Sequence, residues 1–163
     1  MTPKEFILKY KDAAYQIEKD YGVPAIAILA QGALESGWGK KAIGYNIFGI
    51  KFKKGDYDFQ KVLTTEYSKS PDKFKGCEIT SIVYIKESGL YRYKIYQYFA
   101  DYKNAYDAFE SHAKLLTLRY KDAFRWQHSP KRFLIAVWRL GYATAPNYGK
   151  TACAVVDSVK RRL

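Results

Sequence analysis

The sequence has few cysteines and no long apolar segment, and these absences exclude several classes of protein. Cys77 and Cys153 lie far apart and neither belongs to a CxxC pair, so we expect two free, partly buried thiols rather than a zinc or redox site. A disulfide between them has no support in the sequence. No apolar run approaches the roughly 20 residues needed to span a bilayer, so membrane insertion is not expected. With 163 residues, of which 48% are hydrophobic, the chain is long enough for one domain with its own core.

Most sequence signatures of catalysis are also missing. The chain has no GxSxG elbow, P-loop, GxGxxG loop or HExxH pair. Its two histidines are His112 and His128, and His112 falls on the apolar face of an expected helix, which is typical of a core histidine. Nucleophilic triads and zinc-dependent hydrolysis are therefore unsupported, and we expect no metal and no cofactor.

The N-terminus has no basic region followed by a long apolar stretch, so no Sec-type signal peptide is expected. Three alternatives follow. The chain stays inside the cell, leaves by another route, or is one domain of a longer protein.

The chain is strongly basic, with a formal net charge of +12. Such a surface attracts nucleic acid, anionic lipid or the anionic polymers of a bacterial wall. The basic residues are spread out, with short clusters at Lys51–Lys54 and Lys160–Arg162, and no Arg-rich helix accompanies them. We therefore expect a solvated surface rather than a nucleic-acid-binding one. The 16 tyrosines suit either sugar rings or core packing.

Helical patterns occupy both ends of the chain. Thr2 and Glu5 form a capping box around Pro3, and Gly22 ends the first expected helix. A second helix over 24–36 is apolar on most sides, which predicts a central, buried position. Further helices are expected at about 104–120, at 129–140 and from 146 onward.

A segment of different character separates these helices. Between about 61 and 100, β-forming residues alternate with polar ones over 61–67, 79–85 and 90–99, with turn residues at 70–72 and 87–89. This predicts a small antiparallel sheet of two or three strands inserted between helices. The expected fold class is α+β, mainly α.

One carboxylate is distinguished by its position. Glu35 lies in the last turn of the apolar helix 24–36, at the negative end of the helix dipole. Apolar surroundings also disfavour charge, so both effects raise the pKa of this carboxyl, as a general acid requires. Gly37 and Gly39 would allow close approach of a ligand, and Trp38 could pack on the acid or on a sugar. The alternative is a glutamate that reaches solvent at a helix end.

Several motifs occur in the order found in one known family. Ala30–Gly39 reads AQGALESGWG, Tyr45–Lys51 reads YNIFGIK, Thr64–Tyr67 reads TTEY and Gly141–Tyr148 reads GYATAPNY. Together with the strand-to-helix passage Tyr93–Ala113, they resemble the family 73 glycoside hydrolases, which are peptidoglycan N-acetylglucosaminidases of the lysozyme-like superfamily. The resemblance spans almost the whole chain.

The resemblance implies a catalytic set. Glu35 matches the family's catalytic acid. Glu66 matches a glutamate of the β-lobe that positions or activates water, or stabilises the acetamido group of the substrate. Tyr142 matches a tyrosine that supports catalysis.

The resemblance also implies substrate-binding residues. For Asn46 a turn-capping role competes with this one, and for Tyr142 and Tyr148 packing at a helix start does. The expected substrate-binding residues are Gln31, Trp38, Asn46, Phe48 and Tyr148.

The resemblance implies one lysozyme-like catalytic domain over residues 1–163, with an α-lobe at about 1–55 and 100–163, a β-lobe at about 56–99, and a cleft between them. The chain departs from the family pattern at Ala145, where Asp is usual, although Thr144 could cap the helix before Pro146. The insert 68–90 is longer and richer in lysine than a minimal hairpin. The sequence does not indicate what either change does to activity or to the wall type accepted.

The implied activity is hydrolysis of the β-1,4 bond between N-acetylglucosamine and N-acetylmuramic acid, with Glu35 as general acid. A carboxyl separation of roughly 6.5–9.5 Å would fit inversion and about 5 Å a covalent intermediate, while assistance by the substrate's N-acetyl group is a third route. The alternatives are a muramidase, a lytic transglycosylase, or a non-catalytic module that binds wall or nucleic acid.

The implied partner is the peptidoglycan glycan strand, bound by a monomer without nucleic acid. We expect action at the bacterial cell wall, in the periplasm or outside the cell. Export by a holin, in a phage particle or through a secretion system would suit an endolysin or a similar enzyme. A domain cut from a larger autolysin is the other alternative.

Overall fold

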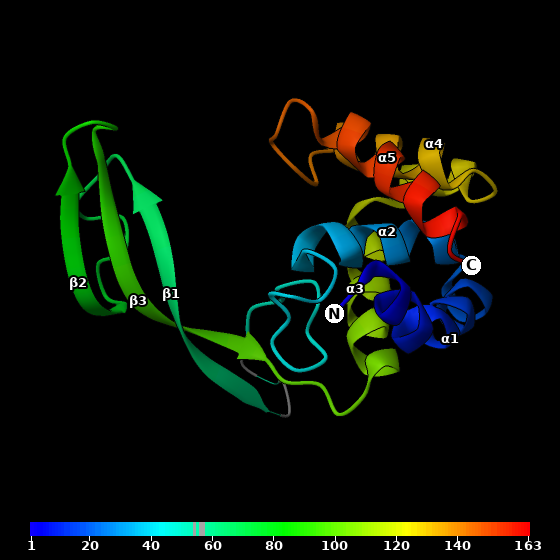
Figure 1. The fold of residues 1–163 in the computed structure, drawn as a ribbon, viewed down its shortest axis with the longest axis horizontal. Helices are drawn as coiled ribbons and strands as arrows, with labels where there is room; N and C mark the ends of the chain where they lie inside the picture. The colour runs from blue at the N-terminus through cyan, green and yellow to red at the C-terminus, as the bar shows by residue number, and fades with distance from the viewer. Residues whose placement is uncertain (54, 56–57) are drawn as a thin grey trace. The chain divides into compact units, whose positions relative to one another are not determined.

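The computed structural model describes residues 1–53, 55 and 58–163, which form two compact units. The first, here called the helical unit, comprises residues 1–50 and 102–163, and the second, the sheet unit, comprises residues 51–101 (Figure 1). The sequence-based boundaries were 1–55 with 100–163, and 56–99. Part of the expected basic cluster 51–54, and the expected start of the β-lobe at 56, lie outside the described residues.

The fold class is the expected one, mainly α with one small antiparallel sheet. The helical unit contains five α-helices and one 3₁₀ helix, η1, among its described residues. In chain order they are α1 (Pro3–Tyr21), α2 (Ala25–Ser36), α3 (Ala105–Arg119), η1 (Lys121–Trp126), α4 (Pro130–Arg139) and α5 (Tyr148–Lys160).

The ends of α1 follow the sequence rules closely. The Thr2 side chain accepts a hydrogen bond from the Glu5 backbone N–H, and the Glu5 carboxylate accepts one from the Thr2 N–H, which completes the expected capping box. Gly22 ends the helix in the left-handed conformation, with φ of 69°. Local chemistry alone therefore sets the limits of this helix.

Helix α2 is the centre of the helical unit, as its apolar sequence predicted. Ala27, Ile28 and Leu29 have no exposed surface, and α2 packs against α1, α4 and α5. A Cβ atom on Gly32 would lie 2.5 Å from Cδ1 of Ile47, so glycine lets the Ile47 side chain pack closely on the helix. This contact joins the loop after α2 to the helix.

The sequence analysis missed one element and misplaced the start of another. It did not predict η1, a tight helical turn between α3 and α4. Helix α5 begins at Tyr148 rather than at Pro146, because the Tyr148 N–H closes a turn onto the Ala145 carbonyl at 3.1 Å. The expected cap by Thr144 is wrong, since the N-cap residue is Asn147 and it makes no side-chain capping bond.

The described residues of the sheet unit form three antiparallel strands in the order β1-β3-β2. They are β1 (Phe59–Ser68), β2 (Glu78–Ile85) and β3 (Leu90–Ala100), and the register sets Glu66 opposite Tyr93. The segment between β1 and β2 covers one face, where Phe74 packs edge-on against Tyr93 with ring centroids 4.9 Å apart. The Tyr93 hydroxyl donates to the Ser70 carbonyl at 2.7 Å, which ties this segment to the central strand.

The two cysteines and the length of the apolar helices were also the subject of predictions. Both cysteines are free, but Cys77 is exposed and only Cys153 is partly buried, so the expectation of two partly buried thiols holds for one of them. In the described part of the chain, no helix combines the length and the apolar character needed to cross a membrane.

Candidate functional site

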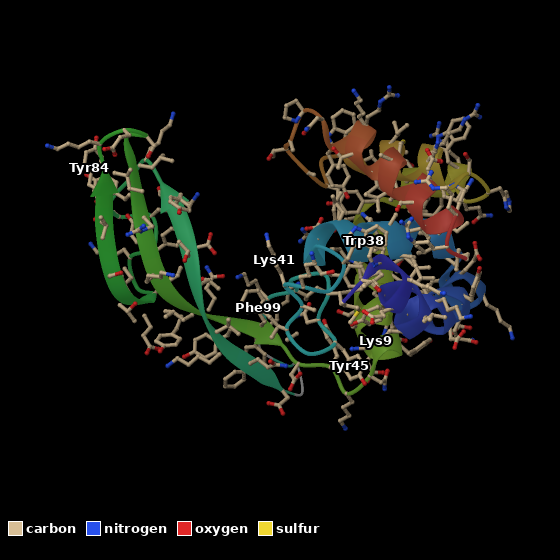
Figure 2. The ribbon with its side chains drawn as sticks, viewed as in Figure 1. Lys9, Trp38, Lys41, Tyr45, Tyr84 and Phe99 are labelled. Carbon is tan, nitrogen blue, oxygen red and sulfur yellow. The ribbon has the colours of Figure 1, made fainter. Side chains whose placement is uncertain are left out.

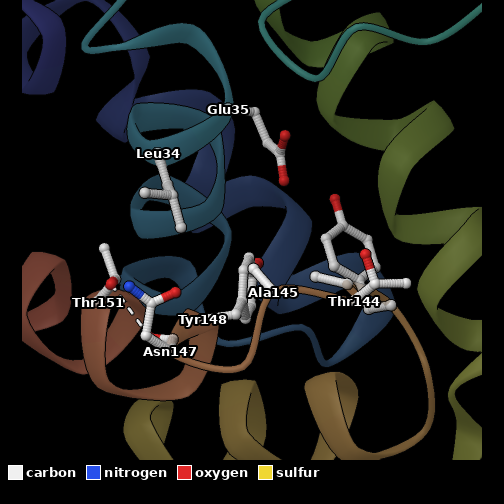
Figure 3. A pocket seen from close by; sticks show the side chains of 9 residues that line it. Leu34, Glu35, Thr144, Ala145, Asn147, Tyr148 and Thr151 are labelled. Atoms are coloured by element: carbon white, nitrogen blue, oxygen red, sulfur yellow. Dashed lines mark hydrogen bonds between the residues drawn. The ribbon is translucent and has the colours of Figure 1, made fainter. Parts of the chain in front are cut away.

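A pocket of about 600 Å³ opens in the helical unit where α2 meets the segment before α5 (Figure 3). The carboxylate of Glu35 extends from α2 toward the loop that carries Thr144 and Ala145. Every lining residue belongs to the helical unit. They are Leu34, Glu35, Tyr142, Ala143, Thr144, Ala145, Asn147, Tyr148 and Thr151.

The turn after Glu35 is built to hold the end of α2. The Ser36 hydroxyl donates to the Gly32 carbonyl at 2.5 Å and accepts from the Gly39 N–H at 2.8 Å. Gly37 and Trp38 are both left-handed, with φ of 57° and 60°, a conformation that is unusual for tryptophan. The left-handed backbone and the Ser36 hydrogen bonds account for the SGWG sequence around this turn. They also fix the position of Glu35 at the end of the helix.

The electrostatics of Glu35 favour its protonated form. Burial raises the pKa of the Glu35 carboxyl above its ordinary value, while a hydrogen bond from the Tyr142 side chain partly offsets this effect. The direction is the one predicted from the position of Glu35 at the end of an apolar helix. A raised pKa extends the pH range over which this carboxyl holds a proton that it can donate to a leaving oxygen.

Two tyrosines stand beside this acid. Tyr142 and Tyr148 both line the pocket, with ring centroids 5.9 Å apart. Burial raises the pKa of Tyr148 to about 12 and raises that of Tyr142 further. Both phenols are therefore neutral at physiological pH, and the Tyr142 hydroxyl can donate to Glu35.

Gln31 lies beneath the pocket and forms hydrogen bonds with the side chains of Tyr148 and His112. It has no exposed surface in this structure, and its expected contact with substrate stays a prediction. Its amide donates to the Tyr148 hydroxyl at 3.5 Å, and its carbonyl oxygen lies 3.1 Å from Nε2 of His112. Because a carbonyl oxygen only accepts, His112 must carry its proton on Nε2. Gln31 therefore connects to the pocket through Tyr148 and, by way of His112, through Tyr142.

His112 is the histidine that the sequence analysis assigned to the core, and this is confirmed by its exposure of 1%. Burial lowers its pKa to about 3, so the ring stays neutral. It stacks on Phe48 with ring centroids 4.1 Å apart and meets the Tyr142 ring edge-on at 5.8 Å. Its indirect connection to the pocket was not predicted, although its place on the buried face of α3 was the available signal.

Three other expected substrate-binding residues do not line this pocket. The Asn46 side chain accepts from the Ile50 N–H at 2.9 Å and donates to the Ile50 carbonyl at 2.8 Å, which is the turn-forming alternative. Phe48 is 8% exposed, beneath the surface. Trp38 packs edge-on against Phe6 with centroids 5.7 Å apart, near the start of α1, and is labelled in Figure 2.

Asn147 and Thr151 are among the pocket residues that the sequence analysis missed. The Thr151 hydroxyl donates to the Asn147 carbonyl at 3.1 Å across the first turn of α5. Asn147 lies within the motif Gly141–Tyr148 and Thr151 four residues further on, and this spacing was the signal that could have identified them.

Glu66 belongs to the sheet unit and has its own surroundings there. The Gln97 amide donates to the Glu66 carboxylate at 3.1 Å. The Lys51 ammonium is close enough for the charge of Glu66 to act on its pKa, and it lies 3.8 Å from the centroid of the Phe99 ring. Gln97 and Lys51 were not among the expected site residues.

The described residues offer no arrangement of three or more His, Cys, Asp or Glu side chains suited to a metal ion. The Glu35 pocket combines a carboxyl whose pKa is raised by burial with two neutral phenols.

The chain resembles peptidoglycan hydrolases in sequence. It is 27% identical over 167 residues to the peptidoglycan hydrolase FlgJ of Vibrio parahaemolyticus, covering 98% of this chain and 48% of the relative. The chain spans about half the length of the curated relatives it matches.

Solved structures agree in fold. The glycoside hydrolase domain of Salmonella typhimurium FlgJ superposes with a TM-score of 0.75 at 26% identity, covering 99% of this chain and 90% of that one. The catalytic domain of the autolysin Auto from Listeria monocytogenes gives 0.68 at 25% identity, covering 100% and 89%.

The family resemblance predicted from the motifs is confirmed by a match that runs through nearly the whole chain. Residues 11–161 match the model of the glucosaminidase family, described as mannosyl-glycoprotein endo-beta-N-acetylglucosaminidase. The chain therefore belongs to the glucosaminidase family of glycoside hydrolases.

Proposed function

We propose that this chain hydrolyses peptidoglycan at the β-1,4 bond between N-acetylglucosamine and N-acetylmuramic acid, with Glu35 as the general acid. The observation that carries the proposal is the position of Glu35 in an open pocket, with a pKa raised by burial. A glycosidase needs such an acid to protonate the leaving oxygen. The relatives named peptidoglycan hydrolases support the choice of polymer.

Glu66 supplies the second carboxylate in this proposal. Glycoside hydrolysis needs a group that activates water, forms a covalent intermediate or orients the substrate's acetamido group. The hydrogen bond from Gln97 holds one oxygen of Glu66 and leaves the other for substrate or water. Both inversion and assistance by the substrate fit this arrangement.

Tyr142 and Tyr148 have supporting roles at the pocket. Tyr142 donates to the Glu35 carboxylate, which stabilises the anion left after proton transfer. Tyr148 accepts a hydrogen bond from the Gln31 amide and contributes its small exposed edge to the pocket lining. In this proposal Gln31, Asn46 and Phe48 support the residues of the pocket from the interior. Trp38 holds the end of α2.

The setting of this activity is the bacterial cell wall, where the chain works as a monomer on glycan strands. The formal charge of +12 favours retention on an anionic wall. Because this attraction acts between exposed charges, added salt weakens it.

The product identifies the bond that is cut. Purified peptidoglycan is digested, reduced with borohydride and analysed by mass spectrometry. The proposal predicts N-acetylglucosaminitol at the new ends. N-acetylmuraminitol would indicate a muramidase, an anhydro-sugar end would indicate a lytic transglycosylase, and the absence of turnover on a zymogram would indicate a binding module. Each of these three results contradicts the proposal.

A further inference from the structure

A second pocket, of about 510 Å³, lies in the helical unit between η1 and α4. It shares no lining residue with the Glu35 pocket. Its volume is in the range of pockets that take small ligands. The lining residues are Asp122, Arg125, Trp126, Arg132, Ile135, Ala136, Arg139 and Leu140.

The polar part of this pocket is strongly cationic. Arg125, Arg132 and Arg139 contribute three guanidinium groups, and Asp122 is the one acidic residue in the lining. The ion pairs found among the described residues involve lysines elsewhere, so no carboxylate neutralises these arginines. Arg125 donates through Nε to the Asp122 backbone carbonyl at 3.2 Å, which leaves its terminal nitrogens available. The arrangement favours an anion.

The remaining lining is aromatic and aliphatic. Trp126 keeps 39% of its surface exposed and Leu140 keeps 45%. The Arg132 guanidinium lies 5.0 Å from the centroid of the Trp126 ring, so the tryptophan orients this arginine while the rest of the indole borders the pocket. An indole surface beside guanidinium groups suits a ligand that has both a flat sugar ring and a negative charge.

We propose that this pocket binds an anionic sugar unit, meaning a pyranose ring that bears a phosphate or a carboxylate. The ring contacts Trp126 and Leu140, and the anion accepts hydrogen bonds from the arginines, whose planar groups match both kinds of anion. The pocket would anchor the chain on anionic glycan independently of Glu35. This proposal goes beyond the hydrolytic function and does not depend on it.

The test measures binding to the whole chain by NMR, through the indole N–H signal of Trp126, and by calorimetry. The probes are glucose 6-phosphate and glucuronate, which distinguish the two sources of charge, with glucose and inorganic phosphate as controls. We expect at least one of the two sugar anions to bind and to shift the Trp126 signal. Glucose lacks the negative charge and inorganic phosphate lacks the sugar ring. We therefore expect each control to bind about tenfold more weakly than the sugar anion.

The variants separate a specific pocket from general charge attraction. Arg125→Gln/Arg132→Gln/Arg139→Gln should weaken binding at least about tenfold, as should Trp126→Ala. Lys4→Gln/Lys11→Gln/Lys19→Gln removes the same charge from α1, outside the pocket, and should keep most of the affinity. Thermal melts confirm that each variant is folded, and peptidoglycan hydrolysis, measured in parallel, should persist in all of them.

Several results would overturn the proposal. One is equal loss of binding in the arginine and lysine variants, which would mean unspecific attraction. Others are inorganic phosphate binding as tightly as glucose 6-phosphate, no binding of either sugar anion, or an oligonucleotide that displaces both. None of these results bears on Glu35, so failure here and failure of the hydrolytic function remain distinguishable.

Discussion

The helical unit and the sheet unit bury their side chains to very different extents. In the helical unit, Phe6, Tyr10 and Ile28 are completely buried in one core that spans its helices. In the described part of the sheet unit, only Tyr93 and Ile95 are equally buried among the large side chains, while Tyr84 on β2, labelled in Figure 2, is 52% exposed.

This difference bears on where each kind of carboxylate can work. A raised pKa needs apolar surroundings that do not rearrange, and Glu35 has them because α2 crosses the core of the helical unit. Glu66 stands on a thin sheet and is held by one amide hydrogen bond. The helical unit therefore suits proton donation, and the sheet unit suits the positioning of substrate or water.

The largest effect is expected at the carboxylate of the helical unit. Glu35→Gln keeps the shape of the side chain and removes the proton donor, so kcat should fall by about 10²–10⁴-fold. The measurement is release of reducing ends from purified peptidoglycan. Glu18→Gln, an exposed position on α1, is the matched control and should be fully active. Full activity in folded Glu35→Gln would contradict the proposed function.

A smaller loss is expected at the carboxylate of the sheet unit. Glu66→Gln should lower kcat by about 10²-fold, the scale of losing one positioned polar group in an active site. Glu87→Gln, in the exposed turn before β3, changes the same charge in the same unit and should have no effect. If Glu66→Gln proved more damaging than Glu35→Gln, the division of roles between the two units would have to be reversed.

The unequal cores predict unequal costs of truncation. Ile28→Ala, in α2, should lower the free energy of unfolding by about 2–5 kcal/mol, because it leaves a cavity in a fully buried core. Ile82→Ala, on β2, should cost no more than about 1 kcal/mol, since this side chain is 46% exposed. Urea denaturation followed by circular dichroism measures both, and equal costs would show that the sheet unit is packed more tightly than its exposure indicates.

The smallest expected effect is on the pH profile. Glu35 must be protonated to act, so kcat/KM should fall as pH rises through its pKa, which burial sets above the ordinary value. The hydrogen bond from Tyr142 lowers that pKa, so Tyr142→Phe should move the alkaline limb to higher pH. Tyr148→Phe is the control, because the Tyr148 hydroxyl is bonded to Gln31 and not to Glu35. A downward shift in Tyr142→Phe would contradict the assigned hydrogen bond.

Features that depend on local chemistry could be predicted from the sequence. The capping box at Thr2, the glycine end at Gly22 and a small antiparallel sheet of two or three strands follow from rules that act over a few residues. The direction of the Glu35 pKa shift was predicted for the same reason, since an apolar helix end disfavours charge whatever surrounds it.

Features that depend on contacts between distant residues could not be predicted. Gln31 was expected at the substrate, but packing of α3 against the centre of the unit places His112 at its carbonyl oxygen and removes it from the surface. For Asn46 the sequence left two roles open, substrate binding and turn capping. In the structure its side chain forms the turn through two hydrogen bonds with the Ile50 backbone.

By itself, the sequence determined the order of the elements other than η1, most of their limits and the family. The tertiary structure decided which residues line the pocket with Glu35, which support it from beneath, and where a second, cationic pocket forms. The physical reason is that helix and strand signals are read over a few neighbouring residues. Burial and pocket lining, by contrast, depend on side chains that only folding brings together.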